Sequence, residues 1–302
     1  MTYAVEVIGL TKTYSDVTAV DNVSFKLEAD KIYGLLGSNG AGKTTIMHML
    51  TAQQFETSGT LRVFGEHPYE NNHVLPQVCF IKESQKYPDN YNVRDVLAIA
   101  AELYPNWDQS FAMSLVEAFQ LPLKRNMKKL SRGMLSSVGI LIGLASRAPL
   151  TIFDEPYLGL DAEKRQLFYD RLLEDYAEHP RTILLSTHLI DEVGTMLEHV
   201  LLIHRGRLLL DEETDSLRGR AFSVSGPAAV VDRFTAGRTI IDRQQLGGLV
   251  TASILNDAGA ASGQSEAESL GLTVAPVSLQ QLTVYYTRLH NRDASSNKGA
   301  EQ

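Results

Sequence analysis

Cysteine is nearly absent from this chain, because Cys79 is the only one among its 302 residues. An internal disulfide is therefore excluded, and a reducing compartment is expected. Long apolar runs are also missing, so no stretch predicts a membrane-spanning helix. The first residues lack the basic and apolar regions of a secretory signal peptide. If this protein works at a membrane, we expect another chain to cross it.

Basic residues are too few to suggest a nucleic-acid-binding surface. Lys and Arg number 28 against 36 Asp and Glu, which gives a net charge of −8. A primary nucleic-acid binder usually carries a basic patch or stripe, so we expect no nucleic-acid partner. The hydrophobic content of 44% allows a sizeable core, and the length is sufficient for one large and one small domain.

The most informative segment is residues 37–45, G-S-N-G-A-G-K-T-T, which fits the phosphate-loop pattern G-x-x-x-x-G-K-[ST]. An apolar run at 32–36 predicts a buried strand before it, and residues 45–50 predict a helix after it. The N–H groups of such a turn and the positive end of the helix favour a bound phosphate. Lys43 is expected to reach the β- and γ-phosphates, and the Thr44 hydroxyl to ligate Mg²⁺. The predicted nucleotide-binding residues of this loop are Gly37, Ser38, Asn39, Gly40, Ala41, Gly42, Lys43, Thr44 and Thr45.

An acidic pair follows the apolar strand predicted at residues 150–153. In a phosphate-loop protein, an acidic residue at such a strand end holds Mg²⁺ directly or through water, which indicates Asp154. Glu155 lies next to it, where a carboxylate can take a proton from the attacking water or orient it. The pair therefore predicts hydrolysis as well as binding.

Two further segments are common features when each is taken alone. Residues 130–134, L-S-R-G-M, begin a predicted helix with Ser131 as its N-cap, and a helix N-terminus suits a phosphate. His188 follows the strand predicted at residues 183–186. Neither segment identifies a site without the phosphate loop.

Taken together, these motifs resemble the ATP-binding subunit of an ABC transporter, over about residues 2–215. Residues 37–45 match the Walker A motif of that family. Residues 150–155 match its Walker B motif, with Glu155 at the place of the catalytic glutamate. The resemblance implies an α/β phosphate-loop ATPase with an antiparallel β subdomain and a helical insertion, using ATP and Mg²⁺.

The remaining motifs follow in the order that the family has. Residues 130–134 resemble the signature motif, residues 159–161 resemble the D-loop, and His188 stands where the family has its switch histidine. Tyr14 lies where the family places an aromatic residue that stacks on adenine; a surface turn tyrosine is the alternative.

The resemblance also implies a second ATP-binding subunit. In the family, two such domains hold two ATP molecules head to tail between them, so ATP binding favours the closed dimer. Each γ-phosphate would contact the phosphate loop of one subunit and Ser131 with Gly133 of the other. Asp161 would cross the interface, and His188 would hydrogen-bond the γ-phosphate. The partner is a second copy of this chain, in a homodimer, or a related ATPase, in a heterodimer.

Two departures from the family pattern affect the site. The family has a glutamine after the strand predicted at residues 78–81, and Glu83 takes that position here, with Gln85 as the alternative. Glutamate can also ligate Mg²⁺, but it adds a negative charge beside the phosphates. In the signature segment, Arg132 replaces the usual small residue and could pair with an acidic group across the dimer. Met134 replaces the usual glutamine.

The predicted ATP-binding domain covers residues 1–215, with the helical insertion at about residues 84–149. Apolar spacing in the insertion predicts three helices, capped by Asn92, Asp108 and Ser131.

Residues 216–291 predict a small α+β domain. The expected order is strand, helix, two strands joined at the glycine pair 247–248, helix and strand, followed by a further helix. This order is typical of a ferredoxin-like module. Residues 292–302 are polar and predict a flexible tail.

The main functional hypothesis is an ATP-hydrolysing subunit that drives a separate integral-membrane permease from the cytoplasmic face of the cell membrane. The small C-terminal module is similar to those on ATPases of bacterial exporters for peptides, antibiotics or lipids. One alternative is a soluble ABC-type ATPase acting on the ribosome or DNA, although such relatives usually carry two nucleotide domains or a long coiled-coil insertion. Another is a regulatory ATP-binding protein, which Glu83 favours and the presence of Glu155 and His188 opposes.

Overall fold

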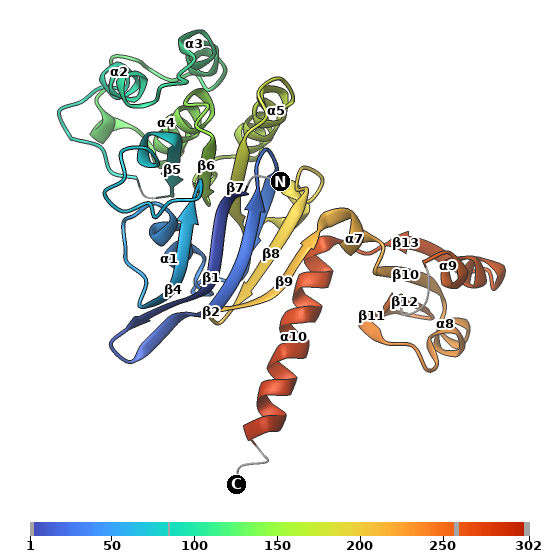
Figure 1. Ribbon diagram of the computed structural model, residues 1–302. Helices are drawn as coiled ribbons and strands as arrows, with labels where there is room; N and C mark the ends of the chain where they lie inside the picture. Colours follow the sequence, from blue (N-terminus) through green and yellow to red (C-terminus); the bar gives the residue numbers. More distant parts are fainter. Residues whose placement is uncertain (1–2, 84, 257–259, 299–302) are drawn as a thin grey trace. The chain divides into compact units, whose positions relative to one another are not determined.

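The computed structural model describes residues 3–83, 85–256 and 260–298 (Figure 1). The chain forms two compact units. The first consists of Met1–His188 and Ile203–Leu208, and the second of Leu189–Leu202 and Leu209–Gln302. The predicted domain boundary after residue 215 stays a prediction.

An antiparallel sheet of three strands, in the order β2-β1-β4, begins the first unit. Its strands are β1 (Tyr3–Tyr14), β2 (Val17–Glu28) and β4 (Ser58–Val63). Register shifts on either side of Leu10 interrupt the alternation of β1, while its pairing with β2 persists to Tyr14.

The second sheet has the order β5-β6-β7-β3-β8-β9, and β5, β6, β7 and β3 pair in parallel. Every residue of β3, β6 and β7 is buried, as expected for strands covered on both faces. Its strands are β3 (Ile32–Leu36), β5 (Val78–Lys82), β6 (Leu150–Asp154), β7 (Thr182–Thr187), β8 (His199–His204) and β9 (Arg207–Glu213). The carboxyl ends of the parallel strands therefore meet at one edge of the sheet, where α/β proteins bind ligands.

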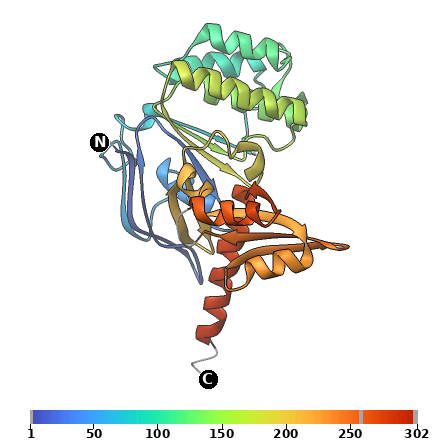
Figure 2. The same ribbon diagram turned by 90° about the vertical axis from the view of Figure 1, so that its right-hand side faces the viewer.

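The predicted helical insertion is present, and its helices begin where their caps were expected. Asn92 forms a reciprocal capping box with Asp95, while Asp108 and Ser131 accept N–H groups in the first turns of their helices. Figure 2 shows α2 and α3 on the side of the unit away from β1 and β2. The helices of the unit are α1 (Lys43–Leu50), α2 (Val93–Leu103), α3 (Gln109–Ala118), α4 (Arg132–Ala145) and α5 (Ala162–Glu178), with short 3-10 turns at Leu75–Gln77 and Met127–Lys129. Within the described ranges, no helix is both long and apolar enough to cross a bilayer.

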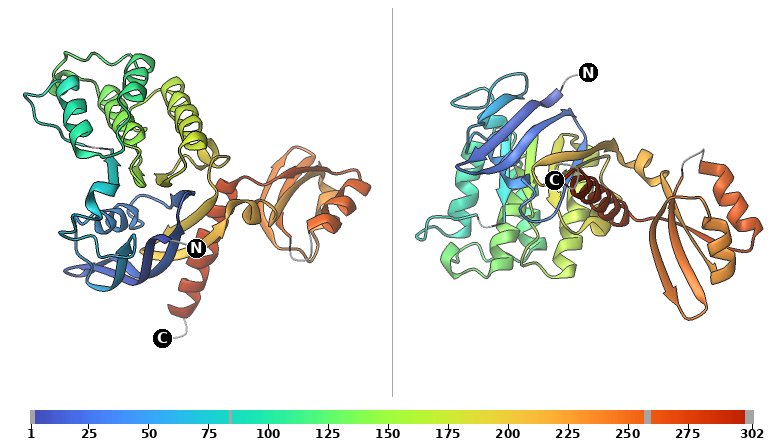
Figure 3. Two further views of the ribbon diagram at one scale, coloured as in Figure 1. Left: turned by 45° about the horizontal axis from the view of Figure 1, so that its top comes forward. Right: turned by 90° about the horizontal axis from the view of Figure 1, so that it is seen from below.

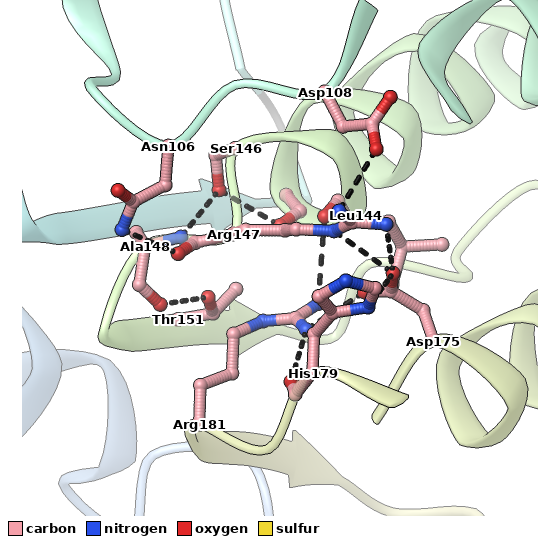
Figure 4. A network of polar contacts seen from close by, with 11 residues as sticks. Asn106, Asp108, Leu144, Ser146, Arg147, Ala148, Thr151, Asp175, His179 and Arg181 are labelled. Carbon is pink, nitrogen blue, oxygen red and sulfur yellow. Dashed lines mark hydrogen bonds and ion pairs between the residues drawn. The ribbon is translucent and has the colours of Figure 1, made fainter. Parts of the chain in front are cut away.

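A buried ionic network joins the helical layer to the amino ends of β6 and β7 (Figure 4). Asp175 of α5 accepts hydrogen bonds from Arg147 at 2.9 and 3.0 Å and from Arg181 at 2.7 Å. Arg147 also pairs with Asp108, the cap of α3, at 2.8 Å. The Asp175 side chain is only 2% exposed, so its charge depends on these two guanidinium groups.

The second unit contains the predicted ferredoxin-like module (Figure 3). Its antiparallel sheet has the order β11-β12-β10-β13, which is the order of that fold. Alternate strand residues such as Phe222 and Ile254 pack against Val231 and Phe234 of α8 and Ala267 of α9. The elements are β10 (Ala221–Pro227), α8 (Ala228–Thr235), β11 (Ile240–Leu246), β12 (Leu249–Leu255), α9 (Ala260–Ser269) and β13 (Thr273–Pro276).

The described part of this unit also contains the helices α6 (Ile190–Val193), α7 (Thr214–Arg218) and α10 (Leu279–Lys298). Helix α10 continues to Lys298 and so extends into the segment predicted as a flexible tail. Residues 299–302 of the predicted tail lie outside the described residues.

Candidate functional site

The phosphate loop connects β3 to α1, as the sequence predicted. Gly42, the residue before α1, has φ +111°, a conformation that favours glycine. A Cβ atom there would also lie 2.6 Å from the Ala19 carbonyl oxygen. The pattern thus requires glycine at this position for two separate reasons.

Residues 203–208, the turn of the β8–β9 hairpin, support the loop from behind within the first unit. Gly206 donates its N–H to the Ala41 carbonyl at 2.9 Å and accepts the Asp21 N–H at 2.8 Å. At Gly37, a Cβ atom would lie 2.2 Å from the Ile203 carbonyl oxygen. The phosphate loop therefore packs directly against the hairpin turn, and these contacts stabilise its conformation.

A cavity of about 740 Å³ opens at this edge of the parallel sheet. It gathers most of the predicted phosphate-loop residues together with the predicted metal ligands and catalytic residues. It is lined by Ala19, Asn39, Gly40, Ala41, Gly42, Lys43, Thr44, Thr45, Glu83, Asp154, Glu155, Leu158 and His188. Residues from separate segments of the sequence thus converge on one space that suits a nucleotide.

Lys43 lies folded over its own loop. Its Nζ donates hydrogen bonds to the carbonyls of Gly37 at 2.7 Å and Ser38 at 3.2 Å and lies 3.7 Å from Glu155 Oε1. Burial lowers the pKa of the Lys43 ammonium, and the nearby Glu155 and Asp154 carboxylates counteract part of this shift. An incoming phosphate would supply a stronger counter-ion than the two carbonyl groups.

Thr44 and Asp154 bring two oxygen ligands into direct contact. The Thr44 hydroxyl donates to Asp154 Oδ2 at 2.7 Å, and the Ser186 hydroxyl donates to Asp154 Oδ1 at 2.5 Å. No group of three His, Cys, Asp or Glu side chains suited to a metal occurs among the described residues. This set fits Mg²⁺, which proteins commonly bind through one or two side chains while substrate phosphates supply further ligands.

Glu155 and His188 form a second pair at the cavity. His188 Nδ1 lies 3.0 Å from Glu155 Oε2. Glu155 has φ +46°, an uncommon conformation for a residue other than glycine, and such strain is concentrated at functional sites. Tyr157, buried nearby, accepts the backbone N–H of His188 at 3.2 Å and is hydrogen-bonded to the Thr187 hydroxyl at 2.6 Å. The histidine is therefore held by its backbone as well as by its ring.

Glu83 reaches the cavity, whereas Gln85 does not line it. Glu83 donates its backbone N–H to the Asp154 carbonyl at 3.0 Å, which continues the parallel pairing of β5 and β6 by one residue. Gln85 lines a different, largely apolar groove. The sequence suggested that Arg132 could pair across a dimer, but its guanidinium is paired with Glu83 of the same chain.

Ser131, Gly133 and Asp161 are not among the residues that line the cavity. Ser131 and Asp161 serve as N-caps, accepting the N–H groups of Met134 at 3.2 Å and Lys164 at 2.9 Å. Gly133 allows a close approach of two chain segments, since a Cβ atom there would lie 2.6 Å from the Gly159 carbonyl oxygen. All three therefore have a structural role within one chain, in addition to any role toward a partner.

Tyr14 is also outside the cavity lining. This tyrosine is 40% exposed, and its hydroxyl donates a hydrogen bond to Gln54 Oε1. Lys12 Nζ lies 5.0 Å from the centre of its ring. An adenine-stacking role for Tyr14 stays a prediction.

Sequence reasoning missed several residues that shape the site. Ala19 and Leu158 line the cavity without any polar group that would mark them in the sequence. Ser186 could have been found, because it lies near the end of β7 directly opposite Asp154 in the parallel register. Tyr157, two residues beyond Glu155, carries no such local signal.

The loop, the acidic strand end and the surrounding sheet define the chain as a phosphate-loop ATPase. The family model described as ABC transporter matches residues 20–158. The chain is 34% identical over 227 residues to the uncharacterized ABC transporter ATP-binding protein YcbN of Bacillus subtilis (strain 168), with 73% of each chain covered. It is 32% identical over 227 residues to the bacitracin transport ATP-binding protein BcrA of Bacillus licheniformis, again over 73% of each chain.

Among solved structures, one described as the ATP binding subunit of an ABC transporter superposes with a TM-score of 0.65 at 25% identity, over 71% of this chain and 92% of the other. The chain belongs to the ABC transporter family. It is an ATP-binding and ATP-hydrolysing subunit, as its motifs predicted.

Proposed function

We propose that the cavity at residues 37–45 is one half of an ATP site that drives a separate membrane permease. Lys43 turns from its loop carbonyls to the β- and γ-phosphates, while Thr44 and Asp154 hold Mg²⁺, which neutralises phosphate charge when it is bound. Glu155 then accepts a proton from the attacking water or orients it, and His188 contacts the γ-phosphate. The contact between Thr44 and Asp154 supports this arrangement most directly.

A second ATP-binding subunit would complete the site. Ser131, Gly133 and Asp161 lie outside the cavity of their own chain, so we propose that they serve the cavity of a partner. The chain carries both halves and is thus sufficient for a homodimer, although a related ATPase could take the partner's place. ATP would stabilise the closed dimer because it contacts both subunits only there.

Substitutions at Ser131 can separate capping from phosphate contact, because Asn and Asp cap helices about as well as Ser. We expect Ser131→Asp to weaken ATP-dependent dimerisation by at least about tenfold, since it places a negative charge against the partner's nucleotide. Ser131→Asn keeps the cap without the charge and should lose much less. Size-exclusion chromatography over a concentration series with saturating ATP measures both. Equal dimerisation of the two variants would show that Ser131 does not contact the partner's nucleotide.

A largely apolar groove of about 320 Å³ in the helical insertion supports docking of a permease. Ile99 and Leu103 of α2 are 41% and 62% exposed at this groove. The Tyr87 hydroxyl is buried there without a hydrogen-bond partner among the described residues. The groove also includes Gln85, two residues beyond Glu83, so a short segment of the chain connects the groove to the ATP site.

Leu103→Glu tests this groove. We expect the charged side chain to reduce co-purification of an integral membrane protein by at least about tenfold, because burying the carboxylate is unfavourable. Leu173→Glu, at an exposed leucine of α5 outside the groove, is the matched control. Affinity purification from membranes, followed by identification of the bound protein, gives the readout. If Leu103→Glu retains the membrane protein as well as Leu173→Glu does, the groove is not the docking site.

We infer that the complex works at the cytoplasmic face of the cell membrane, since the permease must be reached by a subunit that consumes ATP. Similarity to the bacitracin transport protein supports export of a peptide, antibiotic or lipid-like compound. A transport assay with membrane vesicles, in which ATP is supplied on the side of this subunit, tests both direction and substrate class.

A further inference from the structure

Arg132 and Glu83 form an ion pair between two segments that both border the nucleotide site. Arg132 is the first residue of α4, directly after Ser131, and its Nη2 contacts Glu83 Oε1. Glu83 lines the cavity together with Thr44 and Asp154. The pair therefore links the start of α4 to the part of the same chain's cavity where Thr44 and Asp154 lie.

The stem of the Arg132 side chain packs beside a glycine. This stem lies over Gly159, where a Cβ atom would come within 2.9 Å of Arg132 Cγ. The Ser136 hydroxyl, one turn further along α4, donates to the Leu158 carbonyl at 2.7 Å and holds the helix against this loop. The absence of a side chain at Gly159 thus leaves room for the Arg132 stem beside this loop.

The charges at the cavity give the pair a function. Three carboxylates line the cavity, those of Glu83, Asp154 and Glu155, against one ammonium group, that of Lys43. Asp154 accepts hydrogen bonds from two hydroxyl groups. Glu155 lies beside Lys43 and His188. Glu83 has no such partner within the cavity lining, and an unpaired carboxylate there would repel the phosphates of ATP.

We propose that Arg132 is a positioning residue for nucleotide binding, whose guanidinium acts as the counter-ion that allows Glu83 to line the ATP cavity. The affinity for Mg·ATP then depends on the pair and not on either residue alone. Loss of Arg132 leaves a free carboxylate beside the phosphates, whereas loss of both charges restores the balance. This inference rests on the proposed placement of Mg·ATP in the cavity.

A double-mutant cycle tests the proposal in the full chain. Arg132→Gln is expected to raise the dissociation constant of Mg·ATP by about fivefold to tenfold, the effect of one unit charge in a solvent-open site. In the Glu83→Gln background, the same Arg132→Gln change should alter the dissociation constant by less than about twofold, because no carboxylate is left unpaired. Calorimetric titration of Mg·ATP in a Glu155→Gln background measures binding without turnover. The effect of Arg132→Gln should shrink as the salt concentration rises, because both side chains are partly exposed.

Three outcomes separate the alternatives. If Arg132→Gln weakens binding equally with Glu83 intact and in the Glu83→Gln background, Arg132 acts directly on phosphate and the proposal is wrong. If Arg132→Gln has no effect on binding in either background, the pair is only a surface contact and the proposal is also wrong. Lys43→Ala is measured in parallel, and binding that survives it would contradict the placement of ATP in this cavity, independently of the result for the pair.

Discussion

Glu155→Gln is expected to lower the rate of ATP hydrolysis by at least about a hundredfold while leaving ATP bound. The substitution keeps the size of the side chain and removes the carboxylate that would act on water. His188 Nδ1, at 3.0 Å, retains an amide group to contact, so the local structure should persist. Because hydrolysis would no longer separate the subunits, a dimer should accumulate with ATP.

Phosphate release under saturating Mg·ATP gives the rate, and size-exclusion chromatography with and without ATP gives the dimer. Glu117→Gln, at an exposed carboxylate of α3, is the matched control and should behave as the wild type. Hydrolysis that continues at more than about a tenth of the wild-type rate would rule out Glu155 as the base. Slow hydrolysis without any dimer would support Glu155 as the base but contradict the proposed two-subunit site.

Asp175→Ala is expected to lower the free energy of unfolding by about 3–5 kcal/mol. The substitution leaves Arg147 and Arg181 facing a site from which their shared carboxylate has gone, and the Arg181 side chain is only 4% exposed (Figure 4). Burial already lowers the pKa of Arg181, and Asp175 is the group that counteracts this shift. Much of the loss thus comes from the buried Arg181 cation, which loses its carboxylate partner, whereas Arg147 keeps its pair with Asp108.

Glu174→Ala provides the comparison, because Glu174 precedes Asp175 on the same helix and pairs with Arg171 at the surface. Exposed pairs of this kind contribute at most about 1 kcal/mol. Trp107, the single tryptophan, immediately precedes Asp108, so its fluorescence in urea reports unfolding of this region of the first unit. Equal midpoints for the Asp175 and Glu174 variants would show that the network contributes no more than a surface pair.

Local signals made much of this fold predictable. Asn92, Asp108 and Ser131 marked helix starts because a cap acts within three residues of itself. The glycine pair at 247–248 likewise placed the hairpin of the ferredoxin-like sheet. The full length of β1 to Tyr14 lacks such a signal, because its register shifts disturb the period-two pattern from which strands are recognised.

The site was predictable as a set of motifs but not as a set of contacts. The phosphate loop and the acidic strand end announce their chemistry in sequence, and the cavity brings Lys43, Thr44, Asp154 and Glu155 together. The pairing of Arg132 with Glu83 joins residues 49 positions apart, and no local pattern specifies that partner. The ionic network around Asp175 was missed for the same reason, since it is determined by how α4, α5 and β7 pack.

The hairpin turn at Ile203–Leu208 has a consequence for how this chain can be divided. The turn belongs to the first unit, while the segments on both sides of it belong to the second, so the polypeptide passes between the units three times. A chain shortened at His188 would lose the turn that supports Gly37 and Ala41 from behind. The second unit therefore cannot be exchanged as one continuous segment: recombination that replaces the C-terminal module preserves the support of the nucleotide loop only if the junction lies beyond Leu208.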